Sequence, residues 1–197
     1  MQDAIIINSN STGDPARFKT LDELEKQLMA LPEAPAERGS VVMLIRKVEG
    51  GLRETLDQVI LMPDKGIPGD AWGRQPKPDM EAQLTVMQKE VAELIANNQP
   101  LTLFGDNIIV ELDLSARNLP PGSLVKIGSA TLEITPLAHN GCQKFRGRFG
   151  DDALKFVSMK PLRHRNLRGI YMRVIEGGEV RPGDPIIVIS RAQAPAL

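Results

Sequence analysis

The sequence has very few cysteine, histidine and aromatic residues. Its 197 residues include one cysteine and two histidines, and aromatic side chains make up 4% of the chain. A single cysteine excludes an internal disulfide and is typical of a reducing compartment, so we expect a cytoplasmic protein. With so few aromatic residues, the hydrophobic core is expected to consist mainly of Val, Ile, Leu and Met side chains.

The chain also lacks a charge bias and long apolar runs. Its formal net charge is −1, so no overall field attracts nucleic acid or an anionic membrane surface, and we expect neither as a partner. No apolar run approaches the length of a membrane span. The start, residues 1–5, lacks the basic region and apolar core of a signal peptide, so we expect no such peptide.

Common catalytic fingerprints are missing as well. The chain contains no Gly-x-Ser-x-Gly elbow, no P-loop and no dinucleotide-binding glycine motif. The spacing of His139, Cys142 and His164 matches no closed structural zinc site. Nothing in the sequence supports pyridoxal phosphate as a cofactor.

What the chain does contain is a cysteine in strongly basic surroundings. Between residues 144 and 173, nine Lys or Arg residues stand against two acids, Asp151 and Asp152. Nearby positive charge favours the thiolate form of a cysteine, and the thiolate is both the nucleophile and the metal ligand. Cys142 is therefore a candidate catalytic residue. The alternative is that Cys142 is a small buried apolar side chain.

His139 lies three residues before this cysteine. Its imidazole could form a hydrogen bond or a charge pair with the Cys142 thiol, which makes His139 a second candidate catalytic residue. The alternative is a histidine at a strand end with an ordinary structural hydrogen bond. An Asn-Gly pair, Asn140 and Gly141, suits a turn that presents Cys142, and Gly141 permits a close backbone approach.

The N-terminal part of the chain predicts an amphipathic helix followed by a linker. Thr20 and Glu23 have the spacing of a capping box, and Leu21, Leu24, Leu28 and Leu31 then form one apolar stripe. Prolines end the helix, and residues 34–37 read as a linker. We therefore expect residues 1–38 to form an N-terminal extension and residues 39–197 to form the main domain.

The main domain reads as mostly β with minor α. Turn signals delimit about seven or eight short strands and two or three short helices. No strand–helix alternation repeats, so a doubly wound parallel sheet is not expected, and a small curved antiparallel sheet or β-barrel is. The expected strands are 40–48, 54–62, 83–87, 108–110, 123–127, 130–135, 169–176 and 186–189, with hairpin turns at Gly50 and Gly51 and at Gly128 and Ser129. The expected helices are 88–97 and 151–159, the second with Leu154 and Val157 facing inward. Residues 8–15 are expected to be loop and 191–197 a frayed tail.

A loop rich in glycine and proline, residues 63–74, holds the only tryptophan, Trp72. Such loops often carry functional residues. The alternative is a surface connection with Trp72 folded back onto the core.

Several segments, taken in order, resemble the MOSC domain over roughly residues 40–190. This module is found at the C-terminus of molybdenum cofactor sulfurases and as free-standing proteins. The loop at 66–70 is also similar to the family's early glycine-rich loop, but Ala71 and Trp72 stand where the family has a basic residue and a histidine. The segments that carry the resemblance are Gly-Asp-Asn-Ile at 105–108, Leu-Pro-Pro-Gly-Ser-Leu-Val-Lys-Ile-Gly at 119–128, His-Asn-Gly-Cys-Gln-Lys-Phe-Arg-Gly-Arg-Phe at 139–149, Arg-Gly-Ile-Tyr-Met-Arg-Val at 168–174 and Val-Arg-Pro-Gly-Asp at 180–184.

The resemblance implies a mostly β fold and a role for Cys142 in carrying sulfur or in binding the molybdenum cofactor, molybdopterin, as a metal ligand. Pterin cofactors carry a phosphate, which guanidinium groups bind bidentately. The candidate cofactor-binding residues are Arg146, Arg148, Arg165, Arg168 and Asn107. The alternative for each arginine is a solvated basic face or an ion pair with acids of residues 1–37.

The expected partners are a small-molecule cofactor and, for sulfur transfer, a cysteine desulfurase or a molybdoenzyme. The activity itself stays open between a sulfur transferase, an activity that depends on the molybdenum cofactor, and a non-catalytic module. That module would bind molybdopterin or another protein, with Cys142 as a structural thiol.

Overall fold

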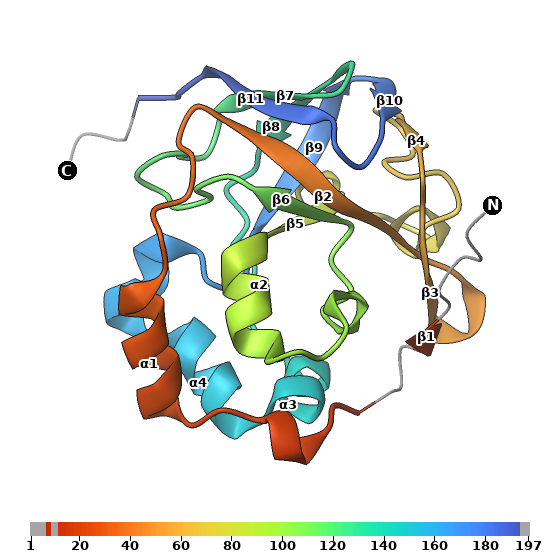
Figure 1. Ribbon diagram of the computed structural model, residues 1–197. Coiled ribbons are helices and arrows are strands. Elements are labelled where there is room, and N and C mark those ends of the chain that lie inside the picture. The colour runs from red at the N-terminus through yellow and green to blue at the C-terminus, as the bar shows by residue number, and fades with distance from the viewer. Residues whose placement is uncertain (1–6, 9–11, 194–197) are drawn as a thin grey trace.

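The computed structural model describes residues 7–8 and 12–193. Strands occupy one half of the molecule, where they curl around a common interior, and the helices gather in the other half (Figure 1). The strands are β1 (Ile7–Asn8), β2 (Arg38–Lys47), β3 (Leu52–Thr55), β4 (Val59–Leu61), β5 (Leu84–Gln88), β6 (Ile108–Glu111), β7 (Leu124–Ile127), β8 (Ala130–Ile134), β9 (Ile170–Glu176), β10 (Gly178–Val180) and β11 (Pro185–Ser190). The α-helices are α1 (Leu21–Ala30), α2 (Lys89–Ala96), α3 (Gln143–Phe149) and α4 (Asp151–Ser158). The 3-10 helices are η1 (Pro15–Arg17), η2 (Glu49–Gly51), η3 (Trp72–Arg74), η4 (Met80–Ala82), η5 (Leu101–Leu103) and η6 (Lys160–Arg165).

Seven strands close into a barrel. They follow the order β2-β11-β7-β8-β9-β5-β6, and β6 pairs back onto β2. All these pairs are antiparallel except β5–β6, which is parallel. A parallel pair needs a crossover connection, and α2 with η5 supplies it. The predicted small β-barrel is thus confirmed, with one parallel pair that the sequence pattern did not indicate.

Two hydrophobic cores stabilise the molecule. The barrel interior is filled almost entirely by Val, Ile and Leu, as the composition predicted. The second core lies between the barrel and the helices, and it contains Phe104, Phe145, Phe149 and Phe156 among its buried side chains. Four of the five phenylalanines of the chain therefore belong to the helical layer.

The predicted helix after Thr20 is confirmed as α1, with both hydrogen bonds of the capping box present. Leu24 and Leu28 are buried in the second core, and Leu21 and Leu31 pack at its edge. The domain boundary near residue 38 stays a prediction.

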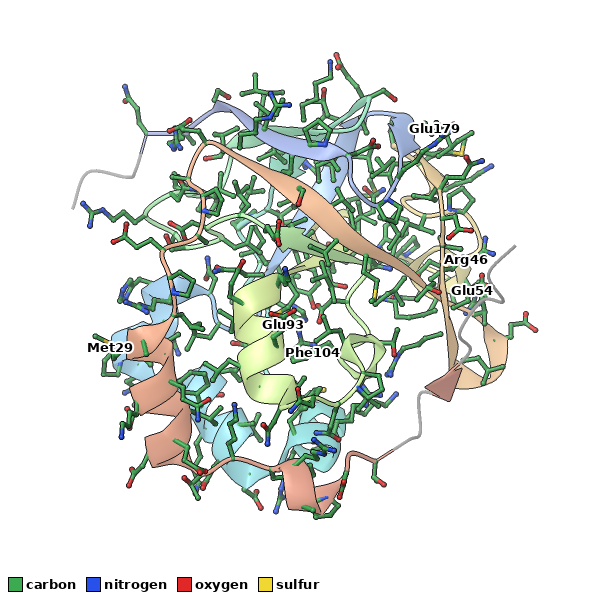
Figure 2. All side chains as sticks on the ribbon, in the orientation of Figure 1. Met29, Arg46, Glu54, Glu93, Phe104 and Glu179 are labelled. Atoms are coloured by element: carbon green, nitrogen blue, oxygen red, sulfur yellow. The ribbon has the colours of Figure 1, made fainter. Side chains whose placement is uncertain are left out.

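The hairpin predicted around Gly50 and Gly51 is present. β2 pairs with β3, and Arg46 and Glu54 form an ion pair across the two strands (Figure 2). However, the single strand predicted for residues 54–62 was wrong. The chain bends after β3, at Asp57, so its second half, β4, pairs with β10 instead of β2.

Other predictions also need correction. The stretch after Cys142 is a helix, α3, which was not expected. In α4, Leu154 and Val157 pack against the second core as expected, but the fully buried side chains are Ala153 and Phe156, which were not singled out.

The chain ends differ in part from the expected loop and tail. Asn8 pairs with Leu52, and Pro15 begins η1, while residues 9–11 lie outside the described part. The expected frayed tail is anchored at its start, because the Arg191 guanidinium donates to the Asn118 backbone oxygen at 2.9 Å and to the Glu37 carboxylate at 2.8 Å. Residues 194–197 also lie outside the described range.

Candidate functional site

Helix α3 positions Cys142. Phe145 and Phe149 are one turn apart, so both rings enter the second core, where they lie 6.0 Å and 4.3 Å from the ring of Phe104. Cys142 is the N-cap residue of this helix and is exposed. The buried phenylalanines thus fix α3 against the molecule while its first turn presents the thiol to solvent.

The residue before the cysteine allows this segment to lie against α4. A Cβ atom on Gly141 would come within 2.5 Å of Leu154 Cδ1 and 3.1 Å of Val157 Cγ2. The predicted close backbone approach at Gly141 is therefore confirmed.

A fully buried carboxylate, Asp106, lies at the centre of a group of charged side chains just before β6. Arg168 Nη1 donates to Asp106 Oδ2 at 2.7 Å, and the Arg168 guanidinium lies 5.2 Å from the centre of the Phe145 ring. Burial opposes ionisation of Asp106, but the charge and hydrogen bond of Arg168 hold the pKa of this carboxyl below its usual range. Asp106 and Arg168 therefore form a buried ion pair.

Two further guanidinium groups lie in the same region. Arg53, from β3, is buried and donates to the backbone oxygens of Thr102 at 3.0 Å and Leu103 at 3.3 Å. Burial, and then the charges of Arg148 and Arg168, lower the pKa of Arg53 to about 10. Burial also lowers the pKa of Arg148 on α3, and the nearby Cys142 acts in the opposite direction. Arg53, Arg148 and Arg168 thus all lie near the carboxylate of Asp106. We call these three arginines together with Asp106 the arginine cluster.

His139 faces this cluster and not the solvent. Its side chain is 8% exposed, its Nδ1 lies 3.6 Å from Asp106 Oδ1, and its ring lies 4.6 Å from that of Tyr171. Burial, and then the charge of Arg168, lower the pKa of His139 to about 3. The imidazole is therefore neutral at neutral pH and cannot form a charge pair with the thiol. Of the two expected interactions, the hydrogen bond between His139 and Cys142 stays a prediction. Burial also raises the pKa of Tyr171.

Several buried polar atoms in and beside the arginine cluster have no hydrogen-bond partner among the described residues. They are Arg53 Nε, Arg168 Nε, Asp106 Oδ1, His139 Nδ1 and Thr102 Oγ1. A buried polar group without a partner costs roughly 1–3 kcal/mol. Such atoms are therefore the natural places for a bound ligand or water to contribute hydrogen bonds.

The remaining predicted site residues lie elsewhere or are already engaged. Asn107 uses its amide within the fold: Oδ1 accepts from Thr85 N at 3.1 Å and Nδ2 donates to Asp70 Oδ1 at 3.0 Å. Arg146 points outward and pairs with Asp151 at 2.6 Å. Arg165 lines a separate hollow. The structure thus brings Arg148, Arg168 and His139 together near Cys142. Arg165 lies elsewhere, and Arg146, one turn from Cys142 on α3, is engaged by Asp151.

Sequence reasoning missed Arg53, Asp106 and Tyr171. Asp106 lay within the Gly-Asp-Asn-Ile motif at 105–108, from which only Asn107 was chosen. Arg53 had no local signal, because its role depends on the position of β3 beside η5.

The glycine-rich loop at 63–74 is packed onto the barrel. Trp72 is buried, and its Nε1 donates to the Asp79 backbone oxygen at 2.7 Å. The buried Asp70 carboxylate accepts from the backbone nitrogens of Lys47 and Trp72, at 2.8 Å and 2.9 Å. Of the two interpretations of this loop, packing of Trp72 onto the core is confirmed.

A family model described as the MOSC domain matches residues 78–187, more than half of the chain. The chain belongs to the MOSC domain family. The matched region of this MOSC protein contains Cys142, His139, Arg148 and Arg168, whereas Arg53 and α1 lie before it. The resemblance noted in the sequence is thus confirmed.

Solved structures support the fold. The YuaD protein from Bacillus subtilis is 18% identical, with a TM-score of 0.56, over 76% of this chain and 94% of that chain. The YiiM protein from Escherichia coli is also 18% identical, with a TM-score of 0.54, over 80% of this chain and 72% of that chain. Similarity at this level of identity concerns the fold alone. No curated protein matches the sequence.

No helix in 7–8 and 12–193 has both the length and the apolar character needed to cross a membrane. The same residues contain no group of at least three His, Cys, Asp or Glu side chains suited to hold a metal ion.

Proposed function

We propose that this MOSC protein binds the molybdenum cofactor and that Cys142 acts there as a thiolate, either as a ligand to the metal or as a carrier of sulfur. One observation carries the proposal: the exposed Cys142 lies within electrostatic range of the buried Arg148, which belongs to the arginine cluster. Positive charge beside a thiol favours its ionised form, which is the reactive and the metal-binding form.

The residues present fit this cofactor in their chemistry. A thiolate is a soft ligand suited to a transition metal, and guanidinium groups suit the phosphate of a pterin. The Nε atoms of Arg53 and Arg168 have no partner among the described residues, so they are the donors most in need of an acceptor. The cofactor, when bound, would supply a metal with a phosphate-bearing organic ligand. Cys142 would hold the metal, and Arg148 and Arg168 would hold the phosphate.

For sulfur transfer, the Cys142 thiolate attacks the outer sulfur of a donor persulfide. A new S–S bond forms at Cys142, the S–S bond of the donor breaks, and the donor leaves as a thiolate. The step exchanges one S–S bond for another and needs no external oxidant or reductant. Arg148 is the positively charged side chain of α3 within electrostatic range of the attacking sulfur. Tyr171 and the neutral His139 form part of the surrounding wall.

The first experiment measures the reactivity of the thiol. Iodoacetamide is expected to label Cys142 in the folded protein at neutral pH. Arg148→Gln is expected to slow the labelling severalfold, because a positive charge near the thiol is lost. Arg181→Gln is the matched control, since Arg181 is exposed, pairs with Glu179 of β10 and lies outside α3, and it is expected to change little. Labelling only after denaturation would contradict the proposal.

The second experiment tests sulfur carriage and cofactor binding. After incubation with a cysteine desulfurase and cysteine, mass spectrometry should detect the gain of one sulfur atom in the native protein and none in Cys142→Ser. A gain that persists in Cys142→Ser would exclude the carrier role. If molybdopterin binding survives in Cys142→Ser while no sulfur is gained by the native chain, the protein is a non-catalytic binding module.

A further inference from the structure

A hollow of about 560 Å³ lies among the helices, and Cys142 and the arginine cluster do not line it. The end of α1, the linker after it, the start of α2, the loop at 113–117 and η6 form its walls. Leu28, Leu31, Val91 and Leu167 provide an apolar floor that continues the second core. Ligand pockets in proteins commonly have volumes of roughly 300–1,000 Å³, so the hollow is large enough for a small organic molecule.

The walls of the hollow are joined to one another by hydrogen bonds. The loop and η6 are connected by Ala116 N to the His164 oxygen and by Asn166 Nδ2 to the Leu114 oxygen, both at 2.8 Å. The linker is held by the bond from Asp113 N to the Pro35 oxygen at 2.9 Å. The hollow is therefore preformed, and a ligand would not have to order its walls.

The polar side of the hollow carries two arginines and a histidine whose side chains have no partner among the described residues. Arg117, Arg165 and His164 line it, and none of these side chains makes a hydrogen bond or ion pair within the described part of the chain. Of the two acids in the lining, Asp113 already accepts hydrogen bonds: its carboxylate accepts from the backbone nitrogen and the hydroxyl of Ser115, at 2.9 Å and 3.0 Å. Glu33, the other acid, is exposed.

We propose that this hollow is a binding site for a small organic anion that has a carboxylate or phosphate head and an apolar body. Guanidinium groups bind both kinds of head bidentately, so Arg117 and Arg165 would hold the charge. The leucines and Val91 would cover the apolar body. This site is independent of the proposed chemistry at Cys142, and it gives Arg165 a role that differs from contact with the pterin phosphate.

Isothermal titration calorimetry of the full chain tests the proposal with four probes: octanoate, phenyl phosphate, inorganic phosphate and octylamine. Octanoate or phenyl phosphate is expected to bind saturably, and the tighter of the two identifies the preferred head group. Arg117→Gln and Arg165→Gln are each expected to weaken that binding about tenfold, the effect of losing one charge-assisted hydrogen bond. Arg163→Gln is the matched control, because Arg163 is an exposed cation of the same η6 that does not line the hollow.

A second variant tests whether the ligand needs the volume and the apolar floor of the hollow. Ala34→Phe places a ring at a half-buried position of the lining, and it is expected to reduce binding while a thermal melt shows that the protein still folds. The proposal is overturned if neither organic anion binds saturably, if octylamine binds as tightly, or if Arg163→Gln weakens binding as much as the other two substitutions. Inorganic phosphate that binds as tightly as phenyl phosphate would also overturn it, because the apolar floor would then contribute nothing.

Discussion

At the scale of single residues, neighbours decide which form each ionisable group takes. His139 and His164 are the two histidines of the chain. Burial beside Arg168 keeps His139 neutral far below the usual histidine range, whereas His164 is exposed at the end of η6. The two imidazoles therefore lie in very different surroundings within one molecule.

This difference predicts how stability depends on pH. The pKa of His139 falls from 6.5 to about 3 on folding, so below its usual pKa the unfolded chain binds a proton that the folded protein excludes. This part of the stability is complete above the unfolded pKa and is lost as the pH falls. Between about pH 7 and about pH 5 the free energy of unfolding should fall by about 2 kcal/mol. Urea unfolding at each pH measures this free energy of unfolding.

The two histidines serve as a matched pair for this measurement. His139→Gln should remove most of the fall in the free energy of unfolding over this interval, since glutamine does not titrate. His164→Gln is the control, because it removes the histidine at an exposed position outside the arginine cluster. An equal slope in both variants would mean that other groups cause the pH dependence.

At the scale of elements, α3 and β9 bring the site together. Their connection runs through α4 and η6, yet Arg168 donates to Asp106 and Arg148 lies within electrostatic range of the same carboxylate. Gly169, which follows Arg168, makes possible the close approach of the start of β9 to β5. It has φ of +89°, and a Cβ atom there would lie 2.3 Å from the Val86 backbone oxygen of β5. Only glycine lets β9 begin this close to its neighbour.

Alanine substitutions at two glycines should therefore have opposite effects. Gly169→Ala adds both backbone strain and a clash with backbone atoms, so it should lower the free energy of unfolding by about 3 kcal/mol. Gly147 lies inside α3, and a Cβ atom there meets nothing within 4 Å. Gly147→Ala should therefore raise the free energy of unfolding by roughly 1 kcal/mol, because alanine favours the helix. Urea denaturation distinguishes the signs, and destabilisation of both variants to the same extent would contradict this account.

At the scale of the whole molecule, the N-terminal helix and the barrel share a core. Leu24 is 1% exposed and packs in the cluster that contains Met87 of β5 and Val91 of α2. Residue 13 also connects the N-terminal segment to α3, because Gly13 N donates to the Gly147 oxygen at 3.1 Å. We propose that the N-terminal extension and the MOSC domain fold as one cooperative unit.

A leucine substitution in α1 tests this proposal. Leu24→Ala should lower the free energy of unfolding by about 2–5 kcal/mol, since it leaves a cavity in a packed core. Unfolding followed by Trp72 fluorescence and by circular dichroism should give coincident transitions that shift together. Met29→Ala is the control, because Met29 in the same helix is 75% exposed (Figure 2). A Trp72 transition that stays unshifted would show that the barrel unfolds independently.

Local patterns were enough to predict most of the elements. The Thr20–Glu23 capping box and the hairpins at Gly50 and Gly128 depend on neighbours in the chain, and these predictions are confirmed. Helix α3 was missed because Gly147 and the preceding Asn-Gly pair weaken its local helical signal. The spacing of Phe145 and Phe149, four residues apart, was the available sign of a helix.

The sequence by itself determined the barrel class, the family likeness and the position of the only cysteine, because strand patterns and ordered motifs are properties of neighbouring residues. The tertiary structure alone decided which cations lie behind Cys142. Arg53, Arg148 and Arg168 come from distant elements, and Asp106 with the surrounding core holds them together. Arg146 and Arg165 are closer to Cys142 in sequence than Arg53 is, but they lie apart from the cluster. Charges act through space, so the fold sets their distances and the sequence spacing does not.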